Sequence, residues 1–168
     1  MTRAPIAARL ARLTLLAPSC LAAFALAACE PGPVTYPLQV IETTTFAPSL
    51  GVDLAASTKQ PSGVYYRDLV LGTGTAITDG AQVDVHYTGA LYDGTVFDSN
   101  TGNATPLRFH YAAGQLIAGF DHGLAGVKAG GTRQLVIPSS QGYGAAGYPP
   151  KIPGNAILVF TVTVVAVQ

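Results

Sequence analysis

The stretch that most constrains the fold of this chain is an alternating segment followed by a turn, Val83 to Asp98. From Val83 to Tyr87, apolar or aromatic residues alternate with polar ones, which is the period of a β-strand with one buried face. Asp93-Gly94 predicts a tight turn, because both residues tolerate the positive φ angles that such turns need. A return strand then begins at Val96-Phe97, so the segment predicts a β-hairpin.

Three side chains of different chemistry converge if this hairpin forms. Tyr87 offers a phenol, Phe97 an aromatic face and Asp98 a carboxylate, all directed at one concave surface. Two interpretations are open on these residues alone: a binding surface, or a core Tyr, a core Phe and a turn Asp.

The charge balance argues against a nucleic-acid partner. The chain has nine Lys and Arg against nine Asp and Glu, but three of the arginines lie within the first 12 positions. Six basic residues against nine acidic ones leave the remainder near −3, whereas nucleic-acid binding needs a basic face. No metal is expected either, because His86, His110 and His122 lack metal-ligand spacing.

Residues 1–28 have the composition of an export signal. Arginines are followed by an apolar run that is short for a membrane span and is interrupted by Pro18. Leu26-Ala27-Ala28-Cys29 resembles the bacterial lipobox, in which the Cys thiol accepts a lipid. The alternative is a plain signal with an incidental Cys29. Because Cys20 would leave with the signal, no disulfide is expected.

Residues 29–57 are predicted to form a Pro-rich leader that begins with the lipidated Cys29. Three prolines between positions 31 and 37 make its start stiff and extended. The β-branched run V-I-E-T-T-T-F at 40–46 is compatible with an edge strand on the following domain. That domain is predicted to span residues 58–168.

The remaining pattern predicts a largely β domain with one helix. Apolar spacing of the helical kind occurs in Gln115–Val127. The Gly, Pro and Tyr content of Ser139–Asn155 predicts a long loop, and such loops are often functional. Ala156–Val167 is almost wholly apolar, which predicts a central strand buried on both faces. Further strands are predicted at 64–71, 106–109 and 133–138.

Three segments together resemble the FKBP-type peptidyl-prolyl cis-trans isomerases. They are V-H-Y-T-G-A-L-Y-D-G-T-V-F-D-S, G-Q-L-I-A-G-F-D-H-G-L-A-G-V-K-A-G-G and Y-G-A-A-G-Y-P-P-K-I-P-G-N-A-I-L-V-F-T-V. Their order and spacing match the family over roughly residues 60–168. The resemblance implies an α+β fold, a twisted antiparallel sheet of five to six strands wrapped around one short α-helix.

The resemblance also implies a proline pocket and the roles of its residues. The residues expected to act on the substrate are Tyr87, Phe97, Asp98, Ile117, Tyr143 and Phe160. Those expected to complete the binding surface are Leu107, Gln115, Leu116, Phe120, Tyr148 and Ile152.

Four positions depart from the family's usual residues. Phe120 stands where many relatives have Trp, Tyr148 replaces a common His and Leu107 replaces a common Phe. Asn103 stands where some relatives place an Arg near the Asp. Tyr87 is therefore expected to orient Asp98 without that Arg.

The implied function is acceleration of X-Pro bond rotation in exported proteins. This reaction breaks no bond, so no nucleophile, metal or cofactor is expected. The alternative is a non-catalytic chaperone or scaffold that only binds proline-containing peptides. Expected partners are proline-containing polypeptides and macrolide inhibitors of the tacrolimus/rapamycin type, and the protein is expected to be a monomer. The Glu30 that follows Cys29 favours lipid anchoring to the outer membrane, facing the periplasm.

Overall fold

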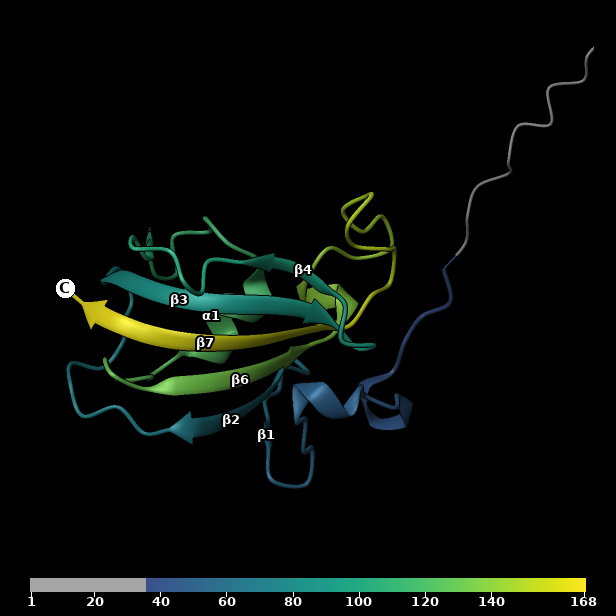
Figure 1. Ribbon diagram of the computed structural model, residues 1–168, viewed down its shortest axis with the longest axis horizontal. Helices are drawn as coiled ribbons and strands as arrows, with labels where there is room; N and C mark the ends of the chain where they lie inside the picture. The colour runs from purple at the N-terminus through teal and green to yellow at the C-terminus, as the bar shows by residue number, and fades with distance from the viewer. Residues whose placement is uncertain (1–35) are drawn as a thin grey trace, which may run out of the picture. The chain divides into compact units, whose positions relative to one another are not determined.

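The computed structural model describes residues 36–168, which form one strongly twisted antiparallel sheet and one α-helix (Figure 1). The strand order is β1-β2-β6-β7-β3-β4, and β5 pairs with β3 beyond the end of β4. The strands are β1 Thr58–Lys59, β2 Tyr65–Val70, β3 Gln82–Leu91, β4 Val96–Ser99, β5 Leu107–His110, β6 Thr132–Ile137 and β7 Leu158–Val167. The predicted fold class is confirmed, with seven strands rather than five or six. The predicted signal and Cys29 lie outside the described residues.

The predicted hairpin and the central strand are both present. β3 and β4 pair antiparallel, and the turn between them contains Gly94 with a φ of 90°. β7 lies between β6 and β3 and pairs with both along most of its length. The apolar run therefore forms an interior strand of the sheet, as its composition predicted.

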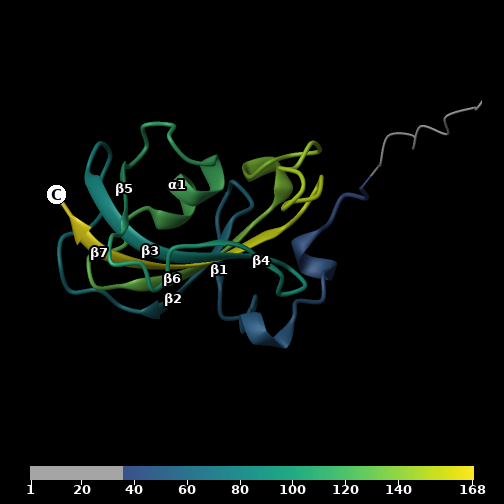
Figure 2. The same ribbon diagram turned by 45° about the horizontal axis from the view of Figure 1, so that its top comes forward.

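The helix α1 (Ala118–Leu124) lies against one face of the sheet and closes the main core (Figure 2). It is shorter than the predicted Gln115–Val127, because Ile117 is extended, with a ψ of 143°, and Gly126 has a φ of 70°. Leu116 and Ile117 are therefore freed from the helix. Gly119 lets the helix approach β6 closely, since a Cβ there would lie 2.3 Å from the Ile137 side chain.

A second core covers the opposite face of the sheet. Because successive strand residues point to opposite faces, Val136 and Val159 face away from the main core that Leu135 and Phe160 enter. The segment 36–57, which we call the strap, packs on this outer face. The buried residues of the second core are Ile41, Tyr65, Val136, Ile157 and Val159, and the strap adds Phe46, Leu50, Val52 and Leu54.

The strap contains two short 3-10 helices, η1 (Ile41–Thr43) and η2 (Pro48–Leu50), in place of the expected edge strand at 40–46. The reason is local. The Thr44 hydroxyl donates to the Val40 carbonyl at 2.7 Å, and the Thr44 N–H donates to Ile41. These bonds close a turn that competes with strand pairing.

Polar contacts join the strap to the sheet at several points. The Gln134 side-chain amide donates to the Leu50 carbonyl at 2.7 Å, and Arg67 donates to the Gly51 carbonyl at 2.6 Å. Glu42 accepts hydrogen bonds from both Lys59 and Tyr65. The strap and the predicted domain 58–168 thus belong to one compact unit, residues 34–168.

Candidate functional site

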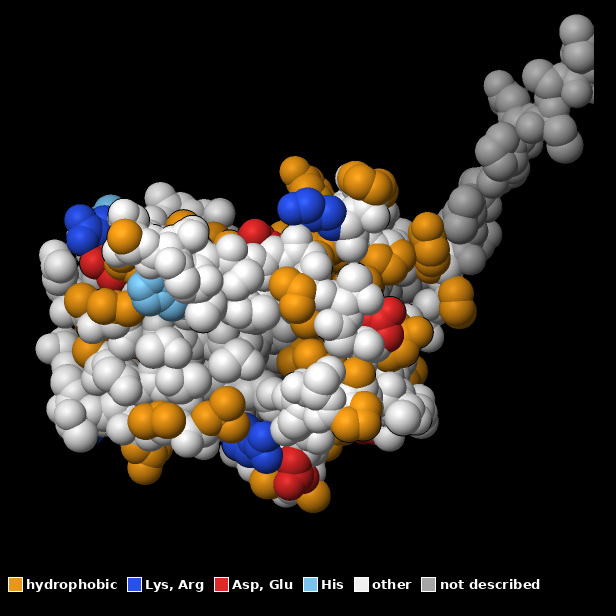
Figure 3. All heavy atoms as spheres, viewed as in Figure 1, with side chains coloured by type: hydrophobic (Ala, Val, Ile, Leu, Met, Phe, Trp, Pro, Cys, Tyr) orange, Lys and Arg blue, Asp and Glu red, His pale blue; other side chains and the backbone are white. Residues whose placement is uncertain are grey.

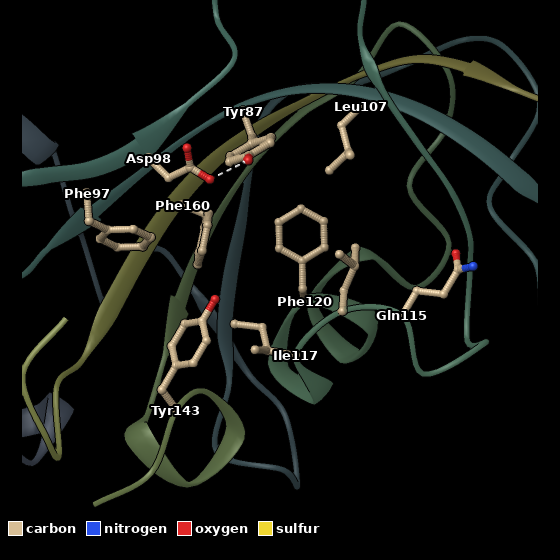
Figure 4. Close-up of a pocket in the computed structure, with 10 residues that line it drawn as sticks. Tyr87, Phe97, Asp98, Leu107, Gln115, Ile117, Phe120, Tyr143 and Phe160 are labelled. Carbon is tan, nitrogen blue, oxygen red and sulfur yellow. Dashed lines mark hydrogen bonds between the residues drawn. The ribbon is translucent and has the colours of Figure 1, made fainter. Parts of the chain in front are cut away.

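A cavity of about 350 Å³ opens between the start of α1 and the inner face of the sheet (Figure 4). Ten of the residues predicted for the site line it. They are Tyr87, Phe97, Asp98, Leu107, Gln115, Leu116, Ile117, Phe120, Tyr143 and Phe160. Segments far apart in the sequence therefore meet at one concave surface.

Phe120, from α1, stands at the centre of the aromatic part of the cavity (Figure 4). Its ring is perpendicular to that of Phe160 on β7, with centroids 5.3 Å apart, and edge-on to Tyr87 at 6.4 Å. Phe97 from β4 packs edge-on against Phe160 at 5.5 Å. Such edge-to-face pairs fix ring orientation, so the cavity has rigid apolar walls.

Gly89 on β3 is a site residue that the sequence reasoning missed. A Cβ at this position would lie 2.7 Å from both the Phe97 and the Phe160 ring. Glycine at this position therefore leaves the space in which the Phe97 and Phe160 rings pack against each other. The sequence T-G-A in the alternating strand could have indicated this role, because glycine inside a strand often marks a point where another group packs closely against the backbone.

Asp98 and Tyr87 form the polar pair of the cavity. The Tyr87 hydroxyl donates to Asp98 Oδ2 at 2.6 Å, and no other side chain among residues 36–168 hydrogen-bonds that carboxylate. Burial, together with this hydrogen bond, raises the pKa of Tyr87 to about 12. The phenol is thus a proton-bearing donor throughout the neutral range, and it orients Asp98 without an Arg, as expected from Asn103.

Two further donors belong to residues that line the cavity and have no hydrogen-bond partner in the described part of the chain. The Ile117 N–H and the Tyr143 hydroxyl make no hydrogen bond to residues 36–168, and Figure 4 shows the Tyr143 hydroxyl pointing into the space beside Phe160. Burial raises the pKa of Tyr143, and the nearby Asp98 charge adds to the effect. Both groups are therefore available as donors to a bound molecule.

Leu107 and Gln115 form the edge of the cavity that β5 and the following loop provide. Gln115 Oε1 accepts a hydrogen bond from the His110 N–H at 2.9 Å, and in Figure 4 its amide points away from Phe120. The Gln115 side chain therefore holds the loop between β5 and α1 rather than projecting into the aromatic space.

Tyr148 and Ile152 do not line the cavity, so the structure does not bring them to the predicted surface. The two residues pair in a narrow bridge within the loop after η3 (Ser139–Gln141), with backbone hydrogen bonds of 2.8 and 2.9 Å. This bridge leaves Ile152 buried in the main core and Tyr148 62% exposed. The Tyr148 ring contacts Tyr143, 5.7 Å away, instead of the cavity.

No group of three His, Cys, Asp or Glu side chains that could hold a metal ion occurs within residues 36–168. Figure 3 shows Lys and Arg side chains scattered singly over the face it presents. The helices of the described region are also too short to cross a membrane.

The fold and the cavity define an α+β protein with an aromatic binding site between one helix and a twisted antiparallel sheet. Comparison with known proteins identifies its family. The family model of the FKBP-type peptidyl-prolyl cis-trans isomerases matches residues 73–165. The chain therefore belongs to this family.

Individual relatives agree with this assignment. An FK506-binding protein of Neisseria meningitidis is 44% identical over 105 residues, which are 62% of this chain and 96% of that protein. FK506-binding protein 4 of Rhizopus delemar is 42% identical over 111 residues. These residues are 66% of this chain but only 29% of the Rhizopus protein. Among solved structures, FkpA from Escherichia coli superposes with a TM-score of 0.62 at 37% identity, covering 67% of this chain and 52% of FkpA.

Proposed function

We propose that this protein accelerates cis–trans rotation about X-Pro peptide bonds in exported polypeptides. The observation that supports this best is the cavity itself, in which rigid aromatic walls surround one oriented carboxylate and two unengaged donors. The cavity is apolar enough to hold a pyrrolidine ring and polar enough to hold the adjoining carbonyls.

The chemistry needs no covalent intermediate. Amide resonance creates the barrier of about 18–20 kcal/mol, so the catalyst must bind the twisted amide better than either planar form. Phe97, Phe120 and Phe160 would enclose the proline ring and remove water from the imide carbonyl. This favours the twisted form, which has less charge separation across the C–N bond and therefore loses less solvation.

The polar groups would orient the substrate. The Ile117 N–H and the Tyr143 hydroxyl would donate to substrate carbonyls, and Asp98, held by Tyr87, would face the rotating carbonyl. A 10⁵-fold acceleration requires about 7 kcal/mol, whereas one hydrogen bond contributes about 0.5–1.5 kcal/mol net. The rate must therefore come from the cavity as a whole.

The proposed substrates are proline-containing polypeptides, and macrolides of the tacrolimus/rapamycin type are the proposed inhibitors.

We further propose a monomer anchored through a lipid on Cys29 to the outer membrane, facing the periplasm. The lipobox-like Leu26-Ala27-Ala28-Cys29 and the following Glu30 support this location. Cys29→Ala is expected to abolish palmitate incorporation and to release the protein from the membrane fraction, and equal labelling would contradict the anchor.

A protease-coupled assay with a proline peptide tests the activity on the unit 34–168. We expect turnover that rises in proportion to protein concentration and is inhibited by the macrolide. Binding of the peptide without turnover would contradict the isomerase and would support a non-catalytic chaperone or scaffold module.

A further inference from the structure

The ladder of hydrogen bonds along one edge of β3 is interrupted at Tyr87. On this edge β5 pairs with β3 from Gln82 to Val85, and β4 pairs with it from Thr88 to Ala90. Tyr87 faces the gap between the two partner strands with both its N–H and its carbonyl. A buried or half-buried strand residue in such a gap needs other partners for these groups.

Asn100, the residue after β4, occupies the gap. Its Oδ1 accepts the Tyr87 N–H at 2.7 Å, its own N–H donates to the Tyr87 carbonyl at 3.1 Å, and its Nδ2 donates to the Val85 carbonyl at 3.1 Å. One asparagine thus makes the contacts that a strand would make, and it links the backbone at Tyr87 to the end of β4.

Neighbouring groups hold Asn100 in place, and the Tyr87 carbonyl and N–H differ in how many hydrogen-bond partners each has. The Asn103 N–H donates to the Asn100 carbonyl at 3.1 Å, and that oxygen also lies 3.2 Å from His86 Nδ1. Ser99 and Thr101 donate their hydroxyls to the Tyr87 carbonyl at 3.0 and 3.1 Å. The Tyr87 carbonyl therefore has three donors, whereas the Tyr87 N–H has Asn100 Oδ1 as its single acceptor among the described residues.

The position of the Tyr87 phenol depends on this backbone. Asp98 lies two residues before Asn100 on the same segment, and the Tyr87 hydroxyl meets it at 2.6 Å. Asn100 therefore joins the two chain segments that carry the donor and the acceptor of this pair. A strand shift of a few tenths of an ångström at the gap would lengthen a bond that is already short.

We propose that Asn100 is a positioning residue of the site, which fixes the Tyr87 backbone and thereby holds the Tyr87 hydroxyl on Asp98. The proposal rests on the proposed isomerase function where activity is concerned. Asn100 is not among the residues that line the cavity. In the sequence alone Asn100 is an ordinary polar residue after the return strand, because its role depends on where β4 ends and β5 begins.

The test compares Asn100→Ala with Thr101→Val. The second variant removes one of the three hydrogen-bond donors to the Tyr87 carbonyl. We expect Asn100→Ala to lower kcat/KM about tenfold, which corresponds to about 1.4 kcal/mol, and Thr101→Val to change it less than about twofold. In a Tyr87→Phe background, where the hydroxyl is already absent, Asn100→Ala should have little further effect. Full additivity of the two changes would overturn the proposal, as would equal kcat/KM for Asn100→Ala and wild type.

Two NMR readouts on the same proteins do not require turnover. Asn100→Ala should speed exchange of the Tyr87 amide proton and shift the Tyr87 Cζ resonance, which reports the hydrogen bond to Asp98, while Thr101→Val leaves both unchanged. Unchanged exchange and resonance in Asn100→Ala would overturn the positioning role even if the proposed activity failed. Should Asn100→Ala not fold, Asn100→Leu keeps a similar side-chain volume but removes the acceptor for the Tyr87 N–H, so it should show the same two changes, and their absence would overturn the proposal.

Discussion

The two faces of the sheet are built from the same strands but differ in how completely they are closed. On the inner face, α1 and the loops leave a cavity in which the Ile117 N–H and the Tyr143 hydroxyl have no protein partner among the described residues. On the outer face, the strap covers the sheet and pairs its polar groups with it. The inner face thus retains binding capacity, and the outer face contributes stability.

The alternation of side chains along β7 makes this division sharp. Phe160 enters the cavity, and its neighbour Val159 is buried in the second core under the strap. Changes on the outer face should therefore affect folding with little effect on catalysis, whereas changes to the residues that line the cavity should affect catalysis.

The largest expected effect on stability is at Ile41, the buried anchor of the strap, which is 4% exposed. Ile41→Ala should lower the free energy of unfolding by about 2–5 kcal/mol, as is usual for buried aliphatic truncations. Its kcat/KM per folded molecule should remain within about twofold of wild type. Urea unfolding with activity measured on the same samples checks both. Leu38→Ala is the control, because Leu38 is 69% exposed, and a tenfold loss of kcat/KM in Ile41→Ala would show that the strap shapes the cavity.

Phe160 and Val159, adjacent residues on β7, allow the two faces to be compared within one strand. Phe160→Leu keeps most of the side-chain volume but loses the aromatic face, so kcat/KM should fall by about tenfold or more, about 1.4 kcal/mol. Val159→Ala should instead destabilise the protein, by about 0.5–3 kcal/mol, and leave kcat/KM nearly unchanged. Circular dichroism confirms folding of both variants. Equal effects of the two changes on kcat/KM would contradict the division of the faces.

A smaller effect is expected at Tyr143. Tyr143→Phe removes a hydroxyl that has no partner within residues 36–168, so stability should not change. Loss of one donor to the substrate should lower kcat/KM about threefold, within the range of a single neutral hydrogen bond. Tyr148→Phe is the matched control, since Tyr148 lies outside the cavity, and a larger loss in the control would contradict the assignment of Tyr143.

The smallest effect is expected at Glu42, which joins the strap to the sheet. Hydrogen bonds from Lys59, and then from Tyr65, lower the pKa of Glu42 from 4.5 to about 2. A carboxyl with a depressed pKa in the folded state contributes stability above its ordinary pKa, and this contribution is lost as the pH falls through about 2. Relative to Glu42→Gln, the wild-type urea midpoint should therefore decline between pH 4.5 and 2. Parallel curves for the two proteins would show that the ion pair does not stabilise the strap.

The inner face was largely predictable from the sequence. The alternation around Tyr87, the Asp93-Gly94 turn and the apolar last strand each have a local physical signature, and ten of the residues that the family resemblance implies line one cavity. Tyr148 and Ile152 do not line the cavity, because the direction of a side chain in a long loop depends on contacts such as the bridge between these two residues.

The outer face and the Asn100 contacts were not predictable in the same way. The β-branched run in the strap favours a strand by composition, but the Thr44 hydroxyl closes a turn on Val40 that propensity does not reveal. Asn100 follows the strand as an ordinary polar residue, and its partners on β3 depend on where β4 ends and β5 begins. The first feature depends on a local side-chain hydrogen bond, and the second on how distant strands pair.

The pH dependence of kcat/KM tests the central claim, that the cavity works by drying and twisting the imide without proton transfer. Tyr87 has a pKa of about 12, and burial raises the pKa of Tyr143 as well, so both phenols keep their protons near neutrality. The wild-type protein should therefore show turnover with a flat kcat/KM from about pH 6 to 8, where an ordinary carboxylate is also ionised. A profile that titrates within this range, and loses the titration in Asp98→Asn, would contradict the claim and assign Asp98 a role in proton transfer.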